Sequence, residues 1–227
     1  MSAQPGVFVV MEGPDKSGKS TQALLLVRAL RRRSVPVVHT REPGGTSLAE
    51  AVRDILLDPD RKIDPLAELF LYEASRAQHT REIILPALRA GKIVLSERYT
   101  MASLAYQGCA RGLGLAVVRT LNRVASCGLV PDLTLVLDIP ESEFGSRPRG
   151  SLDRIEREGA DFRMKVRQAY RRLSRAEPRT LLVNGRLPVA ELHELIASKV
   201  DGLLQKEDFM KRVMPPERES SPPGGED

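Results

Sequence analysis

The stretch Gly13-Pro14-Asp15-Lys16-Ser17-Gly18-Lys19-Ser20 decides the fold, and it lies close to the amino terminus. It fits the pattern GxxxxGK followed by Ser or Thr, a glycine-rich turn that joins a strand to a helix. Backbone N–H groups of such a turn, together with the helix N-terminus, form a cradle for anions. Its glycines allow backbone geometry that side chains block. The pattern therefore predicts that this turn binds the phosphates of ATP or GTP.

The residues on either side give the turn the context that it requires. Val7 to Met11 is a short, apolar run rich in β-branched residues, which predicts a buried parallel strand. Thr21 to Leu30 has apolar residues at helical spacing. Within the turn, Lys19 is placed to reach the β- and γ-phosphates and Ser20 to bind Mg²⁺. The residues predicted to contact ATP are Gly13, Pro14, Asp15, Lys16, Ser17, Gly18, Lys19, Ser20 and Thr21.

Length and composition exclude several classes of protein. The chain has 227 residues, of which 41% are hydrophobic and 29% are charged, as in an ordinary globular domain. No apolar run approaches the roughly 18 residues needed to span a bilayer, and Val7 to Met11 is far too short for a signal peptide. Cys109 and Cys127 lack the spacing of a zinc site, and they predict small buried side chains in a reducing compartment. His79 and His193 are expected at the surface or as caps. We therefore expect a cytoplasmic protein with no membrane partner.

Strand-like and helix-like segments alternate along the chain, which predicts an α/β domain with a mostly parallel sheet. From about Asp208 the chain is rich in Pro, Gly, Ser and charged residues, which predicts a disordered tail after a domain of residues 1–207. Strands are predicted at 7–11, 35–38, 93–95, 133–137 and 180–183, and helices at 21–30, 47–57, 65–90, 100–105, 115–126, 154–176 and 189–204.

The basic residues favour a partner that carries phosphate. The net charge is +5, with 27 arginines and 8 lysines, and 11 basic residues lie among 5 acidic ones between Arg147 and Arg179. Guanidinium forks match phosphate oxygens. The late element Asn/Thr-Lys-x-Asp, with which a GTPase reads guanine, does not occur. A small kinase fits best, and a P-loop protein that binds nucleic acid through residues 147–179 is the alternative from another class.

Eight further stretches follow one another in the order found in a single family. They are Val10-Met11-Glu12-Gly13, Arg41-Glu42-Pro43-Gly44-Gly45-Thr46, Ser75-Arg76-Ala77-Gln78-His79, Pro86-Ala87-Leu88, Glu97-Arg98-Tyr99, Ala105-Tyr106-Gln107-Gly108, Pro131-Asp132-Leu133-Thr134 and Asp153-Arg154-Ile155-Glu156. Together they resemble the thymidylate kinase (dTMP kinase) family over roughly residues 7 to 205, and they place the chain with the bacterial type that has lid arginines.

The resemblance implies the P-loop nucleoside-monophosphate kinase fold, with a five-stranded parallel sheet flanked by helices and a lid at about residues 142–154. It also implies a homodimer that phosphorylates dTMP to dTDP with ATP and Mg²⁺ by in-line transfer, without a nucleic-acid partner. Another monophosphate or deoxynucleoside kinase on the same fold is the second choice of enzyme.

The resemblance further implies which residues hold the sugar and the phosphate of dTMP. Asp15 would bond the 3′-hydroxyl group, and the ring of Tyr106 would crowd the 2′ position and so disfavour ribonucleotides. Arg53 would hold the dTMP phosphate, and Arg98 would bridge the acceptor and donor phosphates. Arginine forks also suit phosphate oxygens on physical grounds.

The same resemblance implies a pocket for the thymine ring. Tyr72, four residues before Arg76, would stack on the base. Arg76 and Ser103 would contact its edge, and Gln107 would lie beside Tyr106. The residues alone leave plainer alternatives open, namely Tyr72 and Phe70 as core side chains and Arg76 as a solvated helix charge.

The chain departs from the family's pattern in two places. Glu97 follows the third strand where the family usually has Asp, and its expected role is to hold a water molecule bound to magnesium. The phosphate-binding turn has Lys16 where one subgroup carries a charge-neutralising arginine, so that arginine is expected in the lid. The expected catalytic residues are Lys16, Lys19, Arg98, Arg147, Arg149 and Arg154.

Overall fold

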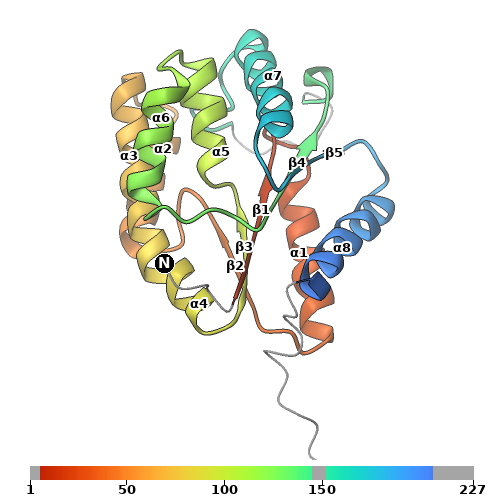
Figure 1. Cartoon of the computed structure of the whole chain (residues 1–227). Helices are drawn as coiled ribbons and strands as arrows, with labels where there is room; N and C mark the ends of the chain where they lie inside the picture. Colours follow the sequence, from red (N-terminus) through yellow and green to blue (C-terminus); the bar gives the residue numbers. More distant parts are fainter. Residues whose placement is uncertain (1–5, 145–151, 207–227) are drawn as a thin grey trace, which may run out of the picture.

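A five-stranded sheet forms the centre of the protein. The structure is a computed structural model, and it describes residues 6–144 and 152–206. The strand order is β2-β3-β1-β4-β5, and every pairing is parallel (Figure 1). This confirms the predicted α/β fold with a five-stranded parallel sheet. The strands are β1 (Val7–Glu12), β2 (Val37–Arg41), β3 (Ile93–Glu97), β4 (Leu133–Asp138) and β5 (Thr180–Asn184).

Helices cover both faces of the sheet (Figure 1). Helices α1 and α8 lie on one face, and the others lie toward the opposite face. The helices are α1 (Lys19–Arg32), α2 (Ser47–Leu57), α3 (Pro65–His79), α4 (Leu85–Arg89), α5 (Thr100–Ser103), α6 (Leu115–Ala125), α7 (Ala160–Ala176) and α8 (Val189–Lys206), with the π-helical turns η1 (Thr80–Ile84) and η2 (Leu104–Ala110) and the 3-10 turn η3 (Glu141–Glu143).

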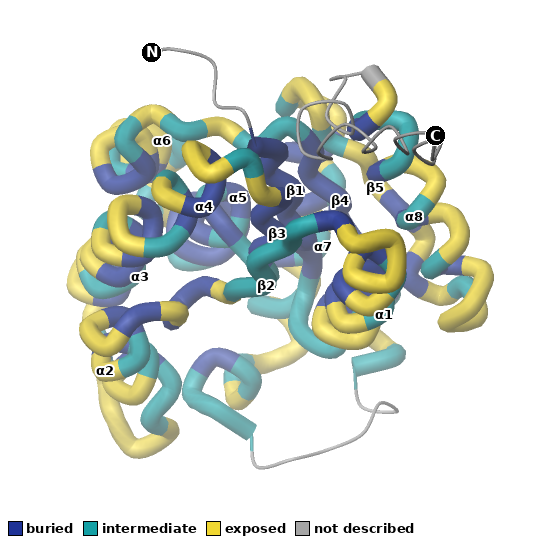
Figure 2. Tube along the Cα trace, turned by 90° about the horizontal axis from the view of Figure 1, so that it is seen from below, coloured by how far each residue is buried: buried dark blue, intermediate teal, exposed yellow. Residues whose placement is uncertain are grey.

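Alternation of side chains along the strands gives each face its own core. Val9 of β1 packs with Leu26 of α1 and Ile196 of α8 on one face. Its neighbour Val10 packs on the other face, in a cluster with Leu88 of α4. Figure 2 shows the buried strands β1, β3 and β4 among helices whose outer sides are exposed. Among the residues described, no helix is both long enough and apolar enough to cross a membrane.

Three helix predictions needed correction. The helix expected at 100–105 is α-helical only to Ser103 and continues as the π-helical turn η2 to Ala110. The helix expected at 154–176 begins at Ala160, because Asp153 Oδ1 accepts the N–H groups of Ile155 and Glu156 and closes a turn there instead. The helical run expected at 65–90 contains the π-helical turn η1, which a search for 3.6-residue spacing does not reveal.

The second strand also differs from the prediction. It begins at Val37 rather than Val35 and extends through His39, Thr40 and Arg41. These residues pair with β3 up to Glu97. Because these three side chains are polar, they form no apolar pattern from which the second half of the strand could be predicted.

The parallel arrangement brings the carboxyl ends of all five strands to one edge of the sheet. Ligands of open parallel sheets bind beyond this edge. Strand β1 lies between β3 and β4, and the phosphate-binding turn follows it directly. The site is therefore built where β1, β3 and β4 end.

Candidate active site

The phosphate-binding turn joins β1 to α1 as the sequence predicted. Gly13 and Gly18 have positive φ angles of 134° and 96°. A Cβ atom at Gly13 would lie 2.4 Å from the carbonyl oxygen of Leu137, so only glycine lets the turn pass this close to β4. Lys19 Nζ donates to the carbonyl oxygens of Gly13 and Pro14 at 3.0 and 2.7 Å. The Lys19 amine therefore binds to its own loop in this structure. When a nucleotide is bound, phosphate oxygens would take the place of these two carbonyl oxygens as its hydrogen-bond acceptors.

The electrostatics of Lys19 point to an anionic ligand. Burial, reinforced by the positive charge of Arg98, lowers the pKa of Lys19 to about 7. The carboxylates of Asp15 and Glu12 oppose this effect without cancelling it. Phosphate groups placed beside the amine would supply the negative charge that favours its protonated form.

A cavity of about 490 Å³ lies next to this turn. Seven of the eight residues expected to bind dTMP line it, and they come from the phosphate-binding turn, α2, α3, the end of β3, α5 and η2. The cavity has an aromatic wall and two arginines, which suits a planar base that carries a phosphate. The seven residues are Asp15, Arg53, Tyr72, Arg98, Ser103, Tyr106 and Gln107.

Arg98 is the centre of the polar network at this cavity. Its φ angle of 68° turns the chain sharply after β3 and directs the side chain toward the phosphate-binding turn. Its guanidinium donates to the carbonyl oxygen of Gly13 and to the hydroxyls of Tyr170 and Tyr106, at 3.2, 3.1 and 3.2 Å. It also forms an ion pair with Asp15. Arg98 is therefore fixed between the acceptor cavity and the phosphate-binding turn.

Two supporting residues of this network were missed from the sequence. The Tyr170 hydroxyl donates to Glu12 Oε2 at 2.8 Å and accepts from Arg98. Glu12 is fully buried, and its other oxygen accepts the N–H groups of Tyr99 and Ala102. Burial raises the pKa of Glu12 above its ordinary value even though Arg98 lies close by. One sequence signal could have identified Glu12: it is a charged residue at the end of an apolar strand, directly before the phosphate-binding turn.

Arg53 on α2 lies at the cavity, where the resemblance implies that it would hold the dTMP phosphate. Its Nη1 donates to the carbonyl oxygen of Pro43 at 2.9 Å. Burial, with the nearby charge of Arg41, lowers the pKa of Arg53. Helix α2 is itself started by Thr46, whose hydroxyl accepts the N–H of Ala49. The turn around Pro43 therefore places this guanidinium at the cavity wall.

Arg76 is the one expected substrate residue that does not line the cavity. Only 1% of its side chain is exposed, so it is not a solvated helix charge. Its guanidinium donates to Glu42, Glu73 and Asn122 and to the carbonyl oxygen of Tyr99, at 2.7 to 3.1 Å. Arg76 reaches the cavity wall through Glu42, which does line it.

The expectation that His79 is a surface or capping residue was wrong. His79 is fully buried, and its ring nitrogens contact Glu42 Oε1 at 3.0 Å and Thr40 Oγ1 at 2.6 Å. A Cβ atom on Gly45 would lie 2.7 Å from this ring. His79 thus links the end of α3 to β2 and to the loop that follows it. No local sequence pattern predicts such a contact between segments that are far apart in the chain.

The two predicted metal ligands lie together. Ser20 Oγ donates to Glu97 Oε2, so these oxygens are close enough to share one cation. Glu97 Oε1 lies 2.9 Å from His39 Nε2. Burial disfavours ionisation of Glu97, but the hydrogen bonds from His39 and Ser20 outweigh burial and lower its pKa. A hydroxyl and an ionised carboxylate are the hard oxygen donors that Mg²⁺ prefers.

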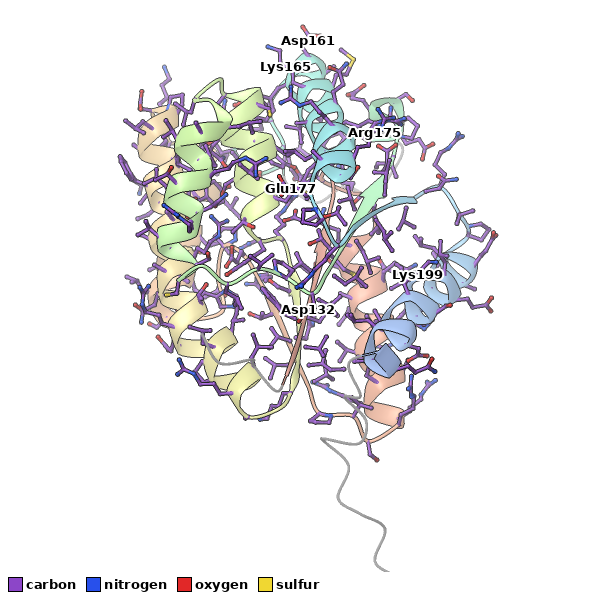
Figure 3. The ribbon with its side chains drawn as sticks, in the orientation of Figure 1. Asp132, Asp161, Lys165, Arg175, Glu177 and Lys199 are labelled. Carbon is purple, nitrogen blue, oxygen red and sulfur yellow. The ribbon has the colours of Figure 1, made fainter. Side chains whose placement is uncertain are left out.

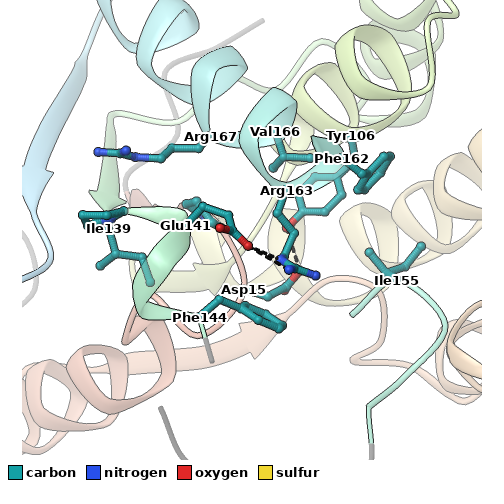
Figure 4. A pocket seen from close by; sticks show the side chains of 12 residues that line it. Asp15, Tyr106, Ile139, Glu141, Phe144, Ile155, Phe162, Arg163, Val166 and Arg167 are labelled. Carbon is teal, nitrogen blue, oxygen red and sulfur yellow. Dashed lines mark hydrogen bonds and ion pairs between the residues drawn. The ribbon is translucent and has the colours of Figure 1, made fainter. Parts of the chain in front are cut away.

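A second cavity, of about 390 Å³, adjoins the first on the side of α7 (Figure 4). The two cavities share Asp15, Tyr106 and Ile155. In Figure 4, Arg163 of α7 pairs with Glu141 across this space, at 2.7 Å. The remaining lining residues are mainly apolar or aromatic: Pro14, Ile139, Pro140, Phe144, Phe162, Val166 and Arg167.

Lys16 contacts Phe144, one of the residues that line this second cavity. Its Nζ is 4.3 Å from the centre of the Phe144 ring, and Arg163 lies 4.5 Å from the same ring. Lys16 has a φ angle of 61°. The turn therefore directs this lysine toward Phe144, where the described part of the chain stops before residue 145.

The expected lid arginines are placed only in part. Arg147 and Arg149 lie outside the described residues. Arg154 Nε donates to the carbonyl oxygen of Leu56 at 2.8 Å, and its Nη2 lies 2.7 Å from Glu68 Oε2 without the alignment of a hydrogen bond. Arg154 does not line either cavity. It joins the segment after residue 151 to α2 and α3.

Several arginines of α7 are used in contacts within the fold. Arg167 and Arg171 both pair with Asp138, at 2.7 and 2.8 Å. The exposed residues Asp161, Lys165 and Arg175 carry both signs of charge along the helix (Figure 3). The described part of the 147–179 segment is therefore a mixed surface rather than a continuous basic face.

Comparison with known proteins agrees with this geometry. The family model described as thymidylate kinase matches residues 11–196. The chain belongs to the thymidylate kinase family. A thymidylate kinase of Pelotomaculum thermopropionicum is 49% identical over 178 residues, which are 77% of this chain and 82% of that protein. Thymidylate kinases of Halothermothrix orenii and Methylococcus capsulatus are 43% and 46% identical, over 88% of this chain and 99% and 97% of theirs.

Thymidylate kinases are nucleoside-monophosphate kinases, and their known reaction is the phosphorylation of dTMP to dTDP. Membership confirms the resemblance seen in the sequence and makes this chain an ATP-binding transferase. It also agrees with a cavity that meets the phosphate-binding turn at Asp15 and Arg98.

Proposed function

We propose that this chain transfers the γ-phosphoryl group of ATP to dTMP bound in the 490 Å³ cavity. The observation that carries the proposal is the position of Arg98, which lines that cavity and donates to Gly13 of the phosphate-binding turn. A phosphate held by Arg53 and a second held by Lys19 would both lie within reach of this guanidinium. In-line transfer between them needs positioning and charge stabilisation rather than a covalent intermediate.

The residues of the cavity would orient the acceptor. Tyr72 offers a ring face to the base, and burial raises the pKa of its hydroxyl so that the group stays neutral. Ser103 and Gln107 offer polar atoms to the edge of the base. Asp15 and Tyr106 would face the sugar. These roles follow from the resemblance and from the positions of the residues, and no proton transfer is needed because the dTMP phosphate is already ionised.

We propose Mg²⁺ as the metal at Ser20 and Glu97. The two oxygen donors fit this ion, and Glu97 lines an open cavity with room for bound water. When bound, the ion would neutralise charge on the β- and γ-phosphates. The chain's own contribution is to fix the two donors beside Lys19.

The reaction is tested by measuring ADP release with a panel of acceptors. Turnover is compared for dTMP, dUMP, CMP, AMP, thymidine and single-stranded DNA. We expect dTMP to give the highest kcat/KM. A higher value for another monophosphate would move the assignment to a different kinase of this fold, and stimulation by DNA alone would support the nucleic-acid alternative.

We also propose a homodimer formed through α3 and α6. These neighbouring helices expose apolar side chains, with Leu66 and Phe70 on α3 and Val117 and Val124 on α6 exposed by 43% to 65% (Figure 1). A second copy of this face would cover them. Light scattering should give twice the chain mass, and Phe70→Asp should give a monomer. Val189→Asp, at a 55% exposed site on α8, is the matched control.

We also propose that this protein is located in the cytoplasm. Cys109 and Cys127 are partly exposed rather than buried as expected, and both are free thiols, as is usual in a reducing compartment. Cell fractionation tests this location. A protein found outside the cytoplasm would contradict it.

A further inference from the structure

His39 and Glu97 belong to neighbouring strands and meet beside the phosphate-binding turn. In the parallel register His39 lies opposite Leu95, and Arg41 lies opposite Glu97. His39 and Glu97 are thus one pleat apart on the face that carries α1. The 2.9 Å contact joins His39 Nε2 to Glu97 Oε1, while Glu97 Oε2 accepts from Ser20.

We propose that His39 is a positioning residue for the metal site, which holds the Glu97 carboxylate so that Oε2 stays on Ser20. The proposal rests on the proposed function, because Ser20 and Glu97 are the residues assigned there to Mg²⁺. In this proposal, His39 does not need to contact phosphate or metal itself. It acts on the metal through Glu97, as partners behind metal ligands commonly do.

Glu97 needs such a partner because its side chain has one more rotatable bond than aspartate, the residue usual in the family. The carboxylate also lines an open cavity of about 650 Å³, together with Arg41 and Glu50. The side chain is 14% exposed, and the open cavity leaves its carboxylate room to rotate. The bond to His39 fixes one oxygen, and that constraint determines the direction of the other.

Arg41 makes this constraint important. Its backbone is directly opposite Glu97, and its guanidinium pairs with Glu50 at 3.0 Å. A Glu97 side chain released from His39 would be free to turn toward this cation and away from Ser20. His39 therefore keeps the carboxylate of Glu97 and the guanidinium of Arg41 in separate pairs.

The geometry fixes the tautomer of His39. A carboxylate only accepts hydrogen bonds, so the proton must be on Nε2 for this contact to form. In ¹⁵N spectra of the wild-type protein without metal or nucleotide, His39 should show a protonated Nε2. Its signal should change in Glu97→Gln. A neutral ring protonated only on Nδ1 would overturn the proposal, and this measurement needs no variant of His39.

Metal affinity provides the second test. Mn²⁺ binding to the enzyme–ADP complex is measured by electron paramagnetic resonance for the wild type, His39→Leu, His39→Gln and the control His193→Leu. We expect His39→Leu to weaken Mn²⁺ binding about 10-fold or more. His39→Gln should recover most of the affinity, because its amide keeps a donor. KM for dTMP should change less than about twofold while kcat falls. Unchanged Mn²⁺ affinity in His39→Leu would overturn the proposal.

A double-mutant cycle separates positioning from packing. In Glu97→Asp the carboxylate is withdrawn by one methylene and no longer reaches His39. His39→Leu should therefore weaken Mn²⁺ binding much less in this background than in the wild type. Equal losses in both backgrounds would show that His39 only packs. The Mn²⁺ titration uses no acceptor and is therefore independent of the reaction with dTMP. A wild-type enzyme that fails to phosphorylate dTMP would contradict the proposed function without changing the outcome of the His39 test.

Discussion

The hydroxyl of Tyr106 donates a hydrogen bond to Asp15 at 2.8 Å, and this bond joins the wall of the acceptor cavity to the phosphate-binding turn. Arg98 contacts both partners, since it pairs with Asp15 and donates to the Tyr106 hydroxyl. The three side chains form a closed triangle. A change in any one of them should therefore alter how acceptor and donor are aligned.

Tyr106 should set the preference for deoxyribonucleotides. Tyr106→Ala removes the ring that would crowd the 2′ position, so the ratio of kcat/KM for dTMP over ribo-TMP should narrow. Tyr106→Phe keeps the ring and should keep the ratio, with a lower kcat because Asp15 loses its hydrogen bond. Steady-state kinetics with both acceptors measure the ratio. An unchanged ratio in a folded Tyr106→Ala would show that the ring only packs.

Lys19→Ala should abolish phosphoryl transfer without unfolding the protein. The amine contacts only backbone carbonyls and Ser17 in the described structure, and burial already disfavours its charge. The variant should keep a cooperative thermal transition while turnover disappears. Lys199→Ala, on α8, serves as the control. Near-normal turnover in Lys19→Ala would contradict the assignment of the phosphate cradle.

We expect the arginines in and near the predicted lid to have two different roles, one in catalysis and one in stability. Arg149→Ala, or failing that Arg147→Ala, should lower kcat by at least about 10²-fold, because an arginine that stabilises the transition state contributes about 10³–10⁵ in related systems. Binding of dTMP should weaken less than about tenfold. Arg154→Ala should instead lower the thermal transition, since Arg154 contacts Glu68 and Leu56. Single-turnover rates within a few-fold of wild type for Arg147→Ala, Arg149→Ala and the double variant would move the catalytic charge to Lys16.

Asp15 should make stability depend on acid pH. Burial opposes ionisation of Asp15, but the charges of Arg98 and Lys19 and the bond from Tyr106 outweigh it and lower the pKa below the ordinary 3.8. The unfolded chain thus binds this proton more readily than the folded chain. The stabilisation is present above about pH 4 and is lost as pH falls through the folded pKa. Urea unfolding from pH 6 downward should show a shallower acid loss for Asp15→Asn, and parallel curves would contradict this.

The chain after about residue 207 should be dispensable. Its composition offers too little apolar surface to offset the entropy of ordering, and residues 207–227 lie outside the described structure. A protein ending at residue 207 should keep its kcat, its KM for dTMP and its thermal transition. Aggregation or loss of most of the activity would show that the tail docks on the domain.

The sequence predicted the parts of the fold that follow a local rule. The apolar residues of all five strands and the turn at Gly13 to Ser20 were found because each has a pattern that a short window contains. The start of α7 was misplaced because Asp153 forms a turn that competes with the helix. The π-helical turn η1 has no spacing of its own to detect.

The residues of the candidate site that were predicted belong to the phosphate-binding turn, follow β3 or match the family's pattern. Arg53, Tyr72 and Ser103 were placed by the resemblance, and the structure brings them together. Tyr170 and His39 were missed because their roles depend on contacts between elements far apart in sequence. Such contacts exist only once the sheet and its flanking helices have assembled.

The end of β3 has a consequence for engineering. Glu97 points to the face of the sheet that carries α1, and the next residue, Arg98, turns to the face that carries η2 and α7. At the carboxyl edge of the sheet, the proposed metal site therefore lies toward α1 and the acceptor cavity lies toward η2 and α7, and Asp15 and Arg98 join the two. New acceptor selectivity can therefore be sought by varying Tyr72 and Gln107, which line the acceptor cavity outside the Asp15–Tyr106–Arg98 triangle, while the residues around the donor phosphates are left unchanged.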